Sequence, residues 1–265
     1  MTVLLENSAV LLAGILLLAG LGYKAKALSR SGAIGTCIIG IMIAAGFKGY
    51  GLLLIGIFFV TSSLWSRYKK KSKANVDEIL EKGSRRDIFQ VFANGMVPAG
   101  FSLGFLLYPS EAWLIGFVTA IAAANSDTWA SEIGTLSKQD PVSILTLRRV
   151  GRGTSGAISL LGTGASVAGA GLIAAVSSIF WAEISLGTAF LITLLGILGC
   201  FVDTYLGASI QASYQCSFCG RTVESHYHCG EPAELVKGYR AVNNDMVNIG
   251  SIVCVSFLAA ILAAS

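Results

Sequence analysis

Long apolar runs restrict what this chain can fold into. Eight of them have the length that a helix needs to cross a bilayer, about 17–25 residues. They lie at roughly 3–22, 31–47, 49–65, 88–107, 112–133, 155–181, 185–210 and 245–264. Charged residues make up only 13% of the sequence, about half their share in a soluble domain. We therefore expect an all-α fold, a polytopic transmembrane bundle of about eight spans that forms one domain over residues 1–265.

Basic residues indicate the orientation of this bundle. The loops at 23–30, 66–86, 134–154 and 211–244 carry all of the 19 Lys and Arg residues except Lys48. Loops that face the cytoplasm are enriched in Lys and Arg. We therefore expect an integral protein of the cell membrane with both termini outside. The basic linker at 66–86 and the loop at 211–244 are then cytoplasmic, and the chemistry should lie on that face.

Three acidic residues lie inside apolar runs. Asp127, Asp203 and Asp245 each lie near the cytoplasmic end of a predicted span. An unpaired charge facing lipid is costly, so each should face protein, water or a cation. Their similar depth predicts one shared site, and carboxylate oxygens are ligands that Mg²⁺ prefers. The alternative is that the acids only form hydrogen bonds between helices.

Further polar side chains lie near the same helix ends. Glu132 and Ser131 follow Asp127 within about two helical turns. We interpret Asp127, Asp203 and Glu132 as catalytic acids and Ser131 as a substrate-binding group. Amide side chains that would orient the substrate are Asn94, Gln211, Asn244 and Asn248.

A basic, glycine-rich segment leads into the sixth span. Its polar members are Arg148, Arg149, Arg152, Gly153, Thr154, Ser155 and Gly156. Glycine lets backbone N–H groups approach a phosphate, and a helix N-terminus adds partial positive charge. Arginine supplies the counter-charge. We expect this segment to bind phosphate, with Arg149 catalytic and the other members binding substrate. The alternative is that the arginines only mark the cytoplasmic side.

The loop at 211–244 contains a cluster of soft metal ligands. Cys216 and Cys219 form a CxxC pair, and His228 and Cys229 follow. This composition suits a tetrahedral zinc site. Structural zinc, free thiols and a redox role all stay open, although a reducing cytoplasm disfavours a disulfide.

Several stretches resemble one known family. They lie at 86–95, 125–134, 146–156, 203–207 and 244–248. Together they resemble the integral membrane family that includes plant phytyl-phosphate kinase and animal transmembrane protein 19. The most specific part is the Asp-Thr-x-Ala-Ser-Glu block at 127–132.

The resemblance implies a membrane kinase. It would convert a prenyl monophosphate, such as phytyl or geranylgeranyl phosphate, to the diphosphate, with CTP as the implied nucleoside triphosphate. Asp127, Asp203 and Asp245 would hold Mg²⁺. Two alternatives are a CDP-lipid-forming cytidylyltransferase and an ion-coupled transporter. We expect contact with membrane lipids and no nucleic-acid partner, and the oligomeric state is left open.

Overall fold

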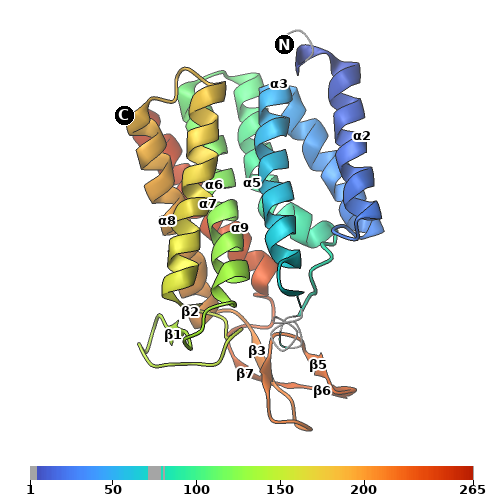
Figure 1. The fold of residues 1–265 in the computed structure, drawn as a ribbon, viewed down its shortest axis with the longest axis vertical. Coiled ribbons are helices and arrows are strands. Elements are labelled where there is room, and N and C mark those ends of the chain that lie inside the picture. Colours follow the sequence, from blue (N-terminus) through green and yellow to red (C-terminus); the bar gives the residue numbers. More distant parts are fainter. Residues whose placement is uncertain (1–4, 71–78, 80, 265) are drawn as a thin grey trace.

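The computed structural model describes residues 5–70, 79 and 81–264, so residues 71–78 and 80 of the predicted basic linker lie outside the described part. Seven helices lie wholly within this part and form a bundle (Figure 1). They are α2 (Ser8–Lys24), α3 (Arg30–Arg67), α5 (Ile88–Leu107), α6 (Glu111–Gly134), α7 (Leu160–Phe180), α8 (Leu186–Ser209) and α9 (Asn244–Ala264). The prediction of a helical bundle is confirmed.

Helix α3 contains two of the predicted spans. Its backbone leaves the helical conformation at Lys48, where φ is 49° and ψ is −137°. The two halves run in opposite directions in Figure 1. The predicted turn around Lys48 and Gly49 is therefore present, and the runs at 31–47 and 49–65 form a helical hairpin.

The number of spans is close to the prediction without matching it helix for helix. Within the described residues, α3, α5, α7, α8 and α9 are long and apolar enough to cross a membrane, whereas α2 is shorter. Helix α6 does not meet the same criterion, because its last turns are polar. It occupies the centre of the bundle, with every residue from Leu114 to Ser126 buried, and packs against α3, α5, α7, α8 and α9.

Polar side chains in the middle of α6 attach it to α7. Asn125 Nδ2 donates to the carbonyl oxygen of Gly169 at 2.7 Å, and the hydroxyls of Ser126 and Ser166 are 2.7 Å apart. Both Asn125 and Ser126 are fully buried. The interpretation of embedded polar groups as links between helices therefore holds for these two residues.

Short strands gather at one end of the bundle. In the loop between α6 and α7, β1 (Val142–Ser143) pairs antiparallel with β2 (Ala157–Ile158). In the loop before α9, β3 (Ser213–Gln215), β4 (Thr222–Val223) and β7 (Glu234–Lys237) form a sheet of order β4-β3-β7, and β5 (Tyr227–His228) pairs with β6 (Glu231–Pro232). The sequence prediction did not include these strands. The start of α2 and the end of α9 lie at the opposite end of the bundle (Figure 1).

The contact between α3 and α5 generates a stability prediction. A Cβ atom at Gly46 would lie 2.1 Å from the backbone oxygen of Ser102, so Gly46→Ala must push the helices apart. Overpacking of this kind costs about 1–3 kcal/mol. We expect a lower Tm for Gly46→Ala in detergent. Gly56→Ala is the control, because a Cβ there meets nothing within 4 Å. Equal Tm values for the two variants would contradict the close packing at Gly46.

Candidate active site

A cleft of about 340 Å³ lies where the helix ends meet the strand-bearing loops. Residues from α5, α6, α7, α8 and α9 line it, together with parts of the loops at 81–86 and 151–159. All three embedded acids, Asp127, Asp203 and Asp245, are among the lining residues. The structure therefore brings these carboxylates from three separate helices to one cleft.

The directions of the helices give this cleft two electrostatic sides. Helices α5, α7 and α9 begin at the cleft, whereas α3, α6 and α8 end there. Helix N-termini carry partial positive charge, and helix C-termini carry partial negative charge. Asp127 lies in the C-terminal part of α6 and Asp203 in the C-terminal part of α8. An anion is favoured near the N-termini, and a cation is favoured near these two acids.

The three acids have different partners. Asp127 lies within hydrogen-bonding reach of the Cys200 thiol and interacts electrostatically with Asp203. Asp203 accepts a hydrogen bond from Ser251 Oγ at 3.2 Å. Asp245 instead forms an ion pair with Lys82. Asp127 and Asp203 therefore supply the acidic side of the cleft, while the charge of Asp245 is already balanced.

The acids do not converge on a single point. In the part of the chain that the structure describes, one group of three or more Asp, Glu, His or Cys side chains has its ligand atoms within 4.8 Å of one another, and it contains none of these acids. A site that uses one or two carboxylates plus substrate phosphates is typical for Mg²⁺. Asp127 and Asp203 are the pair that suits such a site.

Glu132 and Ser131 lie on the outer wall of the cleft. Glu132 accepts a hydrogen bond from Ser66 Oγ and lies close enough to Arg86 for their charges to interact. Ser131 Oγ donates to the backbone oxygen of Asp127 at 2.9 Å. These contacts give Glu132 a role in holding Arg86, alongside the catalytic role that the sequence predicts for it.

The basic side chains that line the cleft differ in part from those that the sequence predicted. Arg152 lines it, as predicted, and its guanidinium donates to the backbone oxygen of Lys138 at 3.2 Å. Arg148 and Arg149 are exposed and lie outside the lining. Lys82 and Arg86, to which the sequence analysis assigned no role in the site, line the cleft instead. The positive charges there come from two loops and not from one.

Lys82 and Arg86 lie directly before α5. Arg86 Nη1 donates to Ser63 Oγ at 3.0 Å, and burial lowers the pKa of its guanidinium below the ordinary value. Burial also opposes the charge of Lys82, but contacts with Asp245 and Asp87 raise its pKa overall. The Lys82–Asp87 distance is 3.2 Å. One sequence signal could have found them, because both precede a span whose first turns carry polar groups on one side.

The glycine-rich segment is held firmly against α8. Gly153 and Gly156 both have φ of 83°, a conformation that favours glycine. A Cβ at Gly156 would lie 2.5 Å from Ala208 Cα, so only glycine fits there. Ser155 Oγ donates to Gln211 Oε1 at 2.9 Å. The lining residues of this segment are Arg152, Gly153, Thr154, Ser155 and Gly156.

The predicted amides separate into two groups. Asn94, Asn244 and Asn248 line the cleft. Gln211 lies outside the lining and is only 1% exposed. Its oxygen accepts from Ser155, and its nitrogen donates to Glu224 Oε1 at 2.9 Å. In this structure Gln211 therefore joins the glycine-rich segment to the loop before α9, and its side chain is not available to a ligand.

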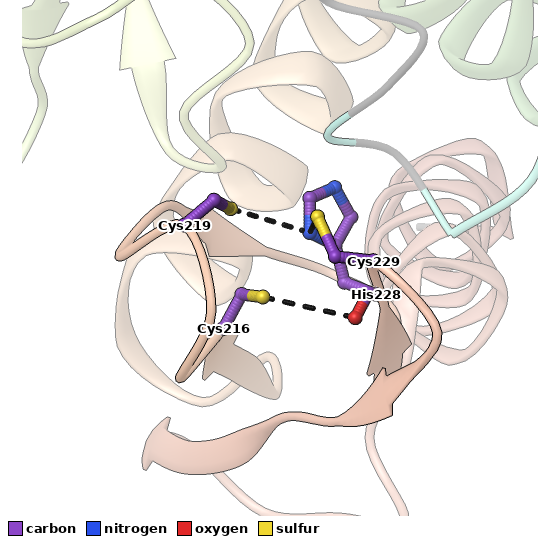
Figure 2. Close-up of side chains that lie close together, drawn as sticks. All are labelled: Cys216, Cys219, His228 and Cys229. Atoms are coloured by element: carbon purple, nitrogen blue, oxygen red, sulfur yellow. Dashed lines mark hydrogen bonds between the residues drawn. The ribbon is translucent and has the colours of Figure 1, made fainter.

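The predicted cysteine and histidine ligands lie together outside the cleft (Figure 2). The ligand atoms of Cys216, Cys219, His228 and Cys229 are all within 4.8 Å of one another. His226 is exposed and does not belong to this group. The four ligand atoms are therefore close enough together to share one metal ion, and zinc stays a prediction at this point.

Comparison with known proteins places the chain in a family of integral membrane proteins. Residues 13–256 match the family described as Integral membrane protein DUF92, so the chain belongs to this integral membrane family. It is 33% identical to Protein PGR of Arabidopsis thaliana, with 92% of each chain covered. It is 37% identical to an uncharacterised membrane protein of Methanocaldococcus jannaschii over 70% of this chain and 75% of that protein.

A second plant relative is Protein VTE6, chloroplastic, of Arabidopsis thaliana, which is 27% identical over 86% of this chain and 64% of that protein. No solved structure matches the chain. The family resemblance inferred from the motifs is confirmed, as is the location in a membrane.

The placement of the arginines leads to a binding prediction. If the glycine-rich segment binds phosphate, as the sequence predicts, Arg152→Gln should weaken binding of a nucleoside triphosphate such as CTP about tenfold, because a hydrogen bond to a charged group contributes roughly 1.5–3 kcal/mol. Arg149→Gln, three residues earlier, should leave the Kd within about twofold, because Arg149 lies outside the lining of the cleft although both arginines are exposed. Calorimetric titration in detergent measures both. A larger loss for Arg149→Gln than for Arg152→Gln would contradict the assignment of Arg152 to the cleft.

Proposed function

We propose that this protein is a membrane phosphotransferase that uses a nucleoside triphosphate, with CTP as the donor, to convert a prenyl monophosphate to its diphosphate. The observation that carries this proposal is the division of one cleft into two charged sides. Asp127 and Asp203 form the acidic side, and Arg86 and Arg152 supply positive charge, to which Lys82 adds only when it leaves Asp245 and Asp87. Two phosphorylated substrates with a divalent cation need both kinds of group in one place.

The position of the cleft supports a lipid acceptor. It lies at the ends of helices whose outer surfaces are apolar, with exposed Leu160 and Leu161 at the start of α7. A prenyl phosphate in the bilayer would place its tail between or beside the helices and its phosphate at the level of the cleft. The motif resemblance to the phytyl-phosphate kinase family supports the same acceptor. The basic loops near the cleft support a cytoplasmic location for it.

The acidic side has the chemistry of a magnesium site. Asp127 and Asp203 provide hard oxygen ligands, and Asp245 could join them only by leaving Lys82. When bound there, Mg²⁺ would neutralise and orient the phosphates of the donor. We assign Asp127 and Asp203 as the principal ligands and Asp245 as an auxiliary one.

The reaction itself demands little covalent chemistry from the protein. A phosphate oxygen of the acceptor attacks the γ-phosphorus of CTP, and the bond from that phosphorus to the β–γ bridging oxygen breaks. CDP leaves with the electron pair of the broken bond. The attacking oxygen is already anionic, so no strong general base is needed. Positioning and charge neutralisation suffice, and Lys82, Arg86 and Arg152 would stabilise the transferring group.

Two other reactions were considered from the sequence. Transfer of CMP to a lipid phosphate, giving a CDP-lipid and pyrophosphate, would use the same charged groups. Ion-coupled transport is less well supported, because transporters of this kind bind substrates near the bilayer midplane. Here the acids lie at the helix ends beside loops.

The proposal is tested with the full chain in detergent. Phytyl or geranylgeranyl monophosphate is incubated with Mg²⁺ and each of CTP, ATP, GTP and UTP, and products are identified by mass spectrometry. We expect the prenyl diphosphate and CDP. A CDP-lipid with pyrophosphate would replace the proposal with cytidylyl transfer. If folded protein, with a cooperative unfolding transition, gives no product with any donor, the proposal is wrong.

A substitution at Asp127 tests the proposed metal site most directly. Asp127→Asn keeps the size of the side chain but removes its charge, so kcat should fall about 100-fold or more, as for loss of a main electrostatic group in other enzymes. Glu111→Gln is the matched control, because Glu111 is exposed in the first turn of the same helix. Its activity should remain at the wild-type level. Unchanged activity in Asp127→Asn would remove the proposed metal role of this residue.

A further inference from the structure

The cluster formed by Cys216, Cys219, His228 and Cys229 is not used by the proposed reaction. His228 Nδ1 lies 3.5 Å from Cys219 Sγ and 3.2 Å from Cys229 Sγ (Figure 2). In a tetrahedral zinc site with Zn–S of about 2.3 Å and Zn–N of about 2.0 Å, neighbouring ligand atoms are roughly 3.5–3.8 Å apart. The observed spacings are therefore close to those that one zinc ion imposes.

The kind and number of ligands indicate a structural site. Three thiols and one imidazole complete a four-coordinate shell, which is the composition of closed structural zinc sites. Catalytic zinc sites keep one position open for water or substrate, and this set leaves none. None of the four residues lines the cleft.

A backbone turn brings the first two ligands of the cluster together. Just after the second ligand, Gly220 N donates to the backbone oxygen of Cys216 at 2.8 Å, and Gly220 has φ of 70°. A backbone hydrogen bond therefore closes the turn that carries Cys216 and Cys219.

The loop that carries the cluster has a small apolar core. Its buried apolar side chains are Ala212, Tyr214 and Val223, with Ala233 and Leu235 packed against them. A core of this size rarely stabilises a folded unit without a metal, a disulfide or a partner. The cysteines are all free, so no disulfide supplies that stability. A structural zinc ion contributes folding free energy directly.

The chain between the two pairs of ligands, Cys216 with Cys219 and His228 with Cys229, contains a residue that lines the cleft. Glu224 lies between Cys219 and His228 in the chain, lines the cleft and accepts from Gln211. Gln211 in turn accepts from Ser155 of the glycine-rich segment. An ion that fixes the two pairs of ligands relative to each other would therefore also fix the loop at 211–244, which contacts the glycine-rich segment.

We propose that Cys216, Cys219, His228 and Cys229 bind one structural Zn²⁺, and that this ion keeps the loop at 211–244 in the conformation that supports the glycine-rich segment. The site is independent of the reaction assigned to the cleft. It would persist if the substrate were different.

Metal content tests the site directly. The full chain is purified in detergent without chelators, and its metals are quantified by inductively coupled plasma mass spectrometry. We expect about one zinc per chain, and X-ray absorption should give three sulfur ligands and one nitrogen ligand. Zinc well below stoichiometry after incubation with excess Zn²⁺ and desalting would overturn the proposal, as would iron in place of zinc.

Matched variants locate the ion. His228→Gln should lose most of the zinc, whereas His226→Gln, two residues away and outside the cluster, should retain it. Cys229→Ser should likewise lose zinc, and Cys254→Ser in α9 should not. Equal zinc content in His228→Gln and His226→Gln would overturn the assignment of ligands.

Chelation of the wild-type chain provides a readout that does not depend on a variant folding. A strong chelator should release one zinc, expose three further thiols to a thiol reagent and lower Tm by roughly 5 °C or more. Restored zinc should restore Tm. If removing zinc leaves Tm and thiol reactivity unchanged, the ion has no structural role. An intact mass lower by two hydrogen atoms, from oxidation of two cluster thiols to a disulfide, would also exclude it.

Discussion

Helix α6 carries polar groups that lipid cannot solvate, and the neighbouring helices take the place of water around them. Asn125 and Ser126 donate hydrogen bonds to backbone oxygens of α7, including that of Gly169, and Asn125 Oδ1 accepts from hydroxyl groups of α3. This requirement places α6 at the centre, with the more apolar α3, α5, α7, α8 and α9 around it. The next residue after Ser126, Asp127, is only partly buried and lines the cleft. The burial of one polar helix thus determines both the arrangement of the bundle and the position of its acidic group.

The antiparallel arrangement of the helices then sets the electrostatics of the cleft. Three helices begin there and three, α3, α6 and α8, end there, so partial charges of both signs lie around a single space. Side chains reinforce this pattern, with Asp127 and Asp203 near the C-termini of their helices and Arg86 just before the N-terminus of α5. Such a cleft suits ligands that combine phosphate groups with a divalent cation. This is the physical basis for assigning it to phosphoryl transfer.

The loops at this end of the bundle are organised by side chains from outside the cleft. Gln211 is almost completely buried and connects Ser155 in one loop to Glu224 in another. Lys237 adds a contact at 2.8 Å to the backbone oxygen of Gly207 in α8. The cysteine–histidine cluster lies further from the bundle, where strands of two to four residues provide little apolar packing. A metal ion there would stabilise the structure that presents the glycine-rich segment to a ligand.

Local sequence determined much of this molecule. Apolar runs predicted the helices, and the break at Lys48 was readable because a basic residue beside glycine interrupts an apolar run. The spacing of Cys216, Cys219, His228 and Cys229 predicted a group that the structure does bring together. The three embedded acids were found because a charge in an apolar run must have a partner. Each of these signals depends on residues that are near one another in the chain.

Tertiary structure alone decided how distant segments share the cleft. Asp245 pairs with Lys82, and that contact joins residues separated by more than half the chain. Arg152 faces the cleft while Arg148 and Arg149 do not, although all three belong to one basic segment. Gln211 resembles a ligand-binding amide in the sequence, yet packing commits both of its polar atoms to other residues. Hydropathy and spacing report what a side chain needs, but only the packing of the helices determines which neighbour meets that need.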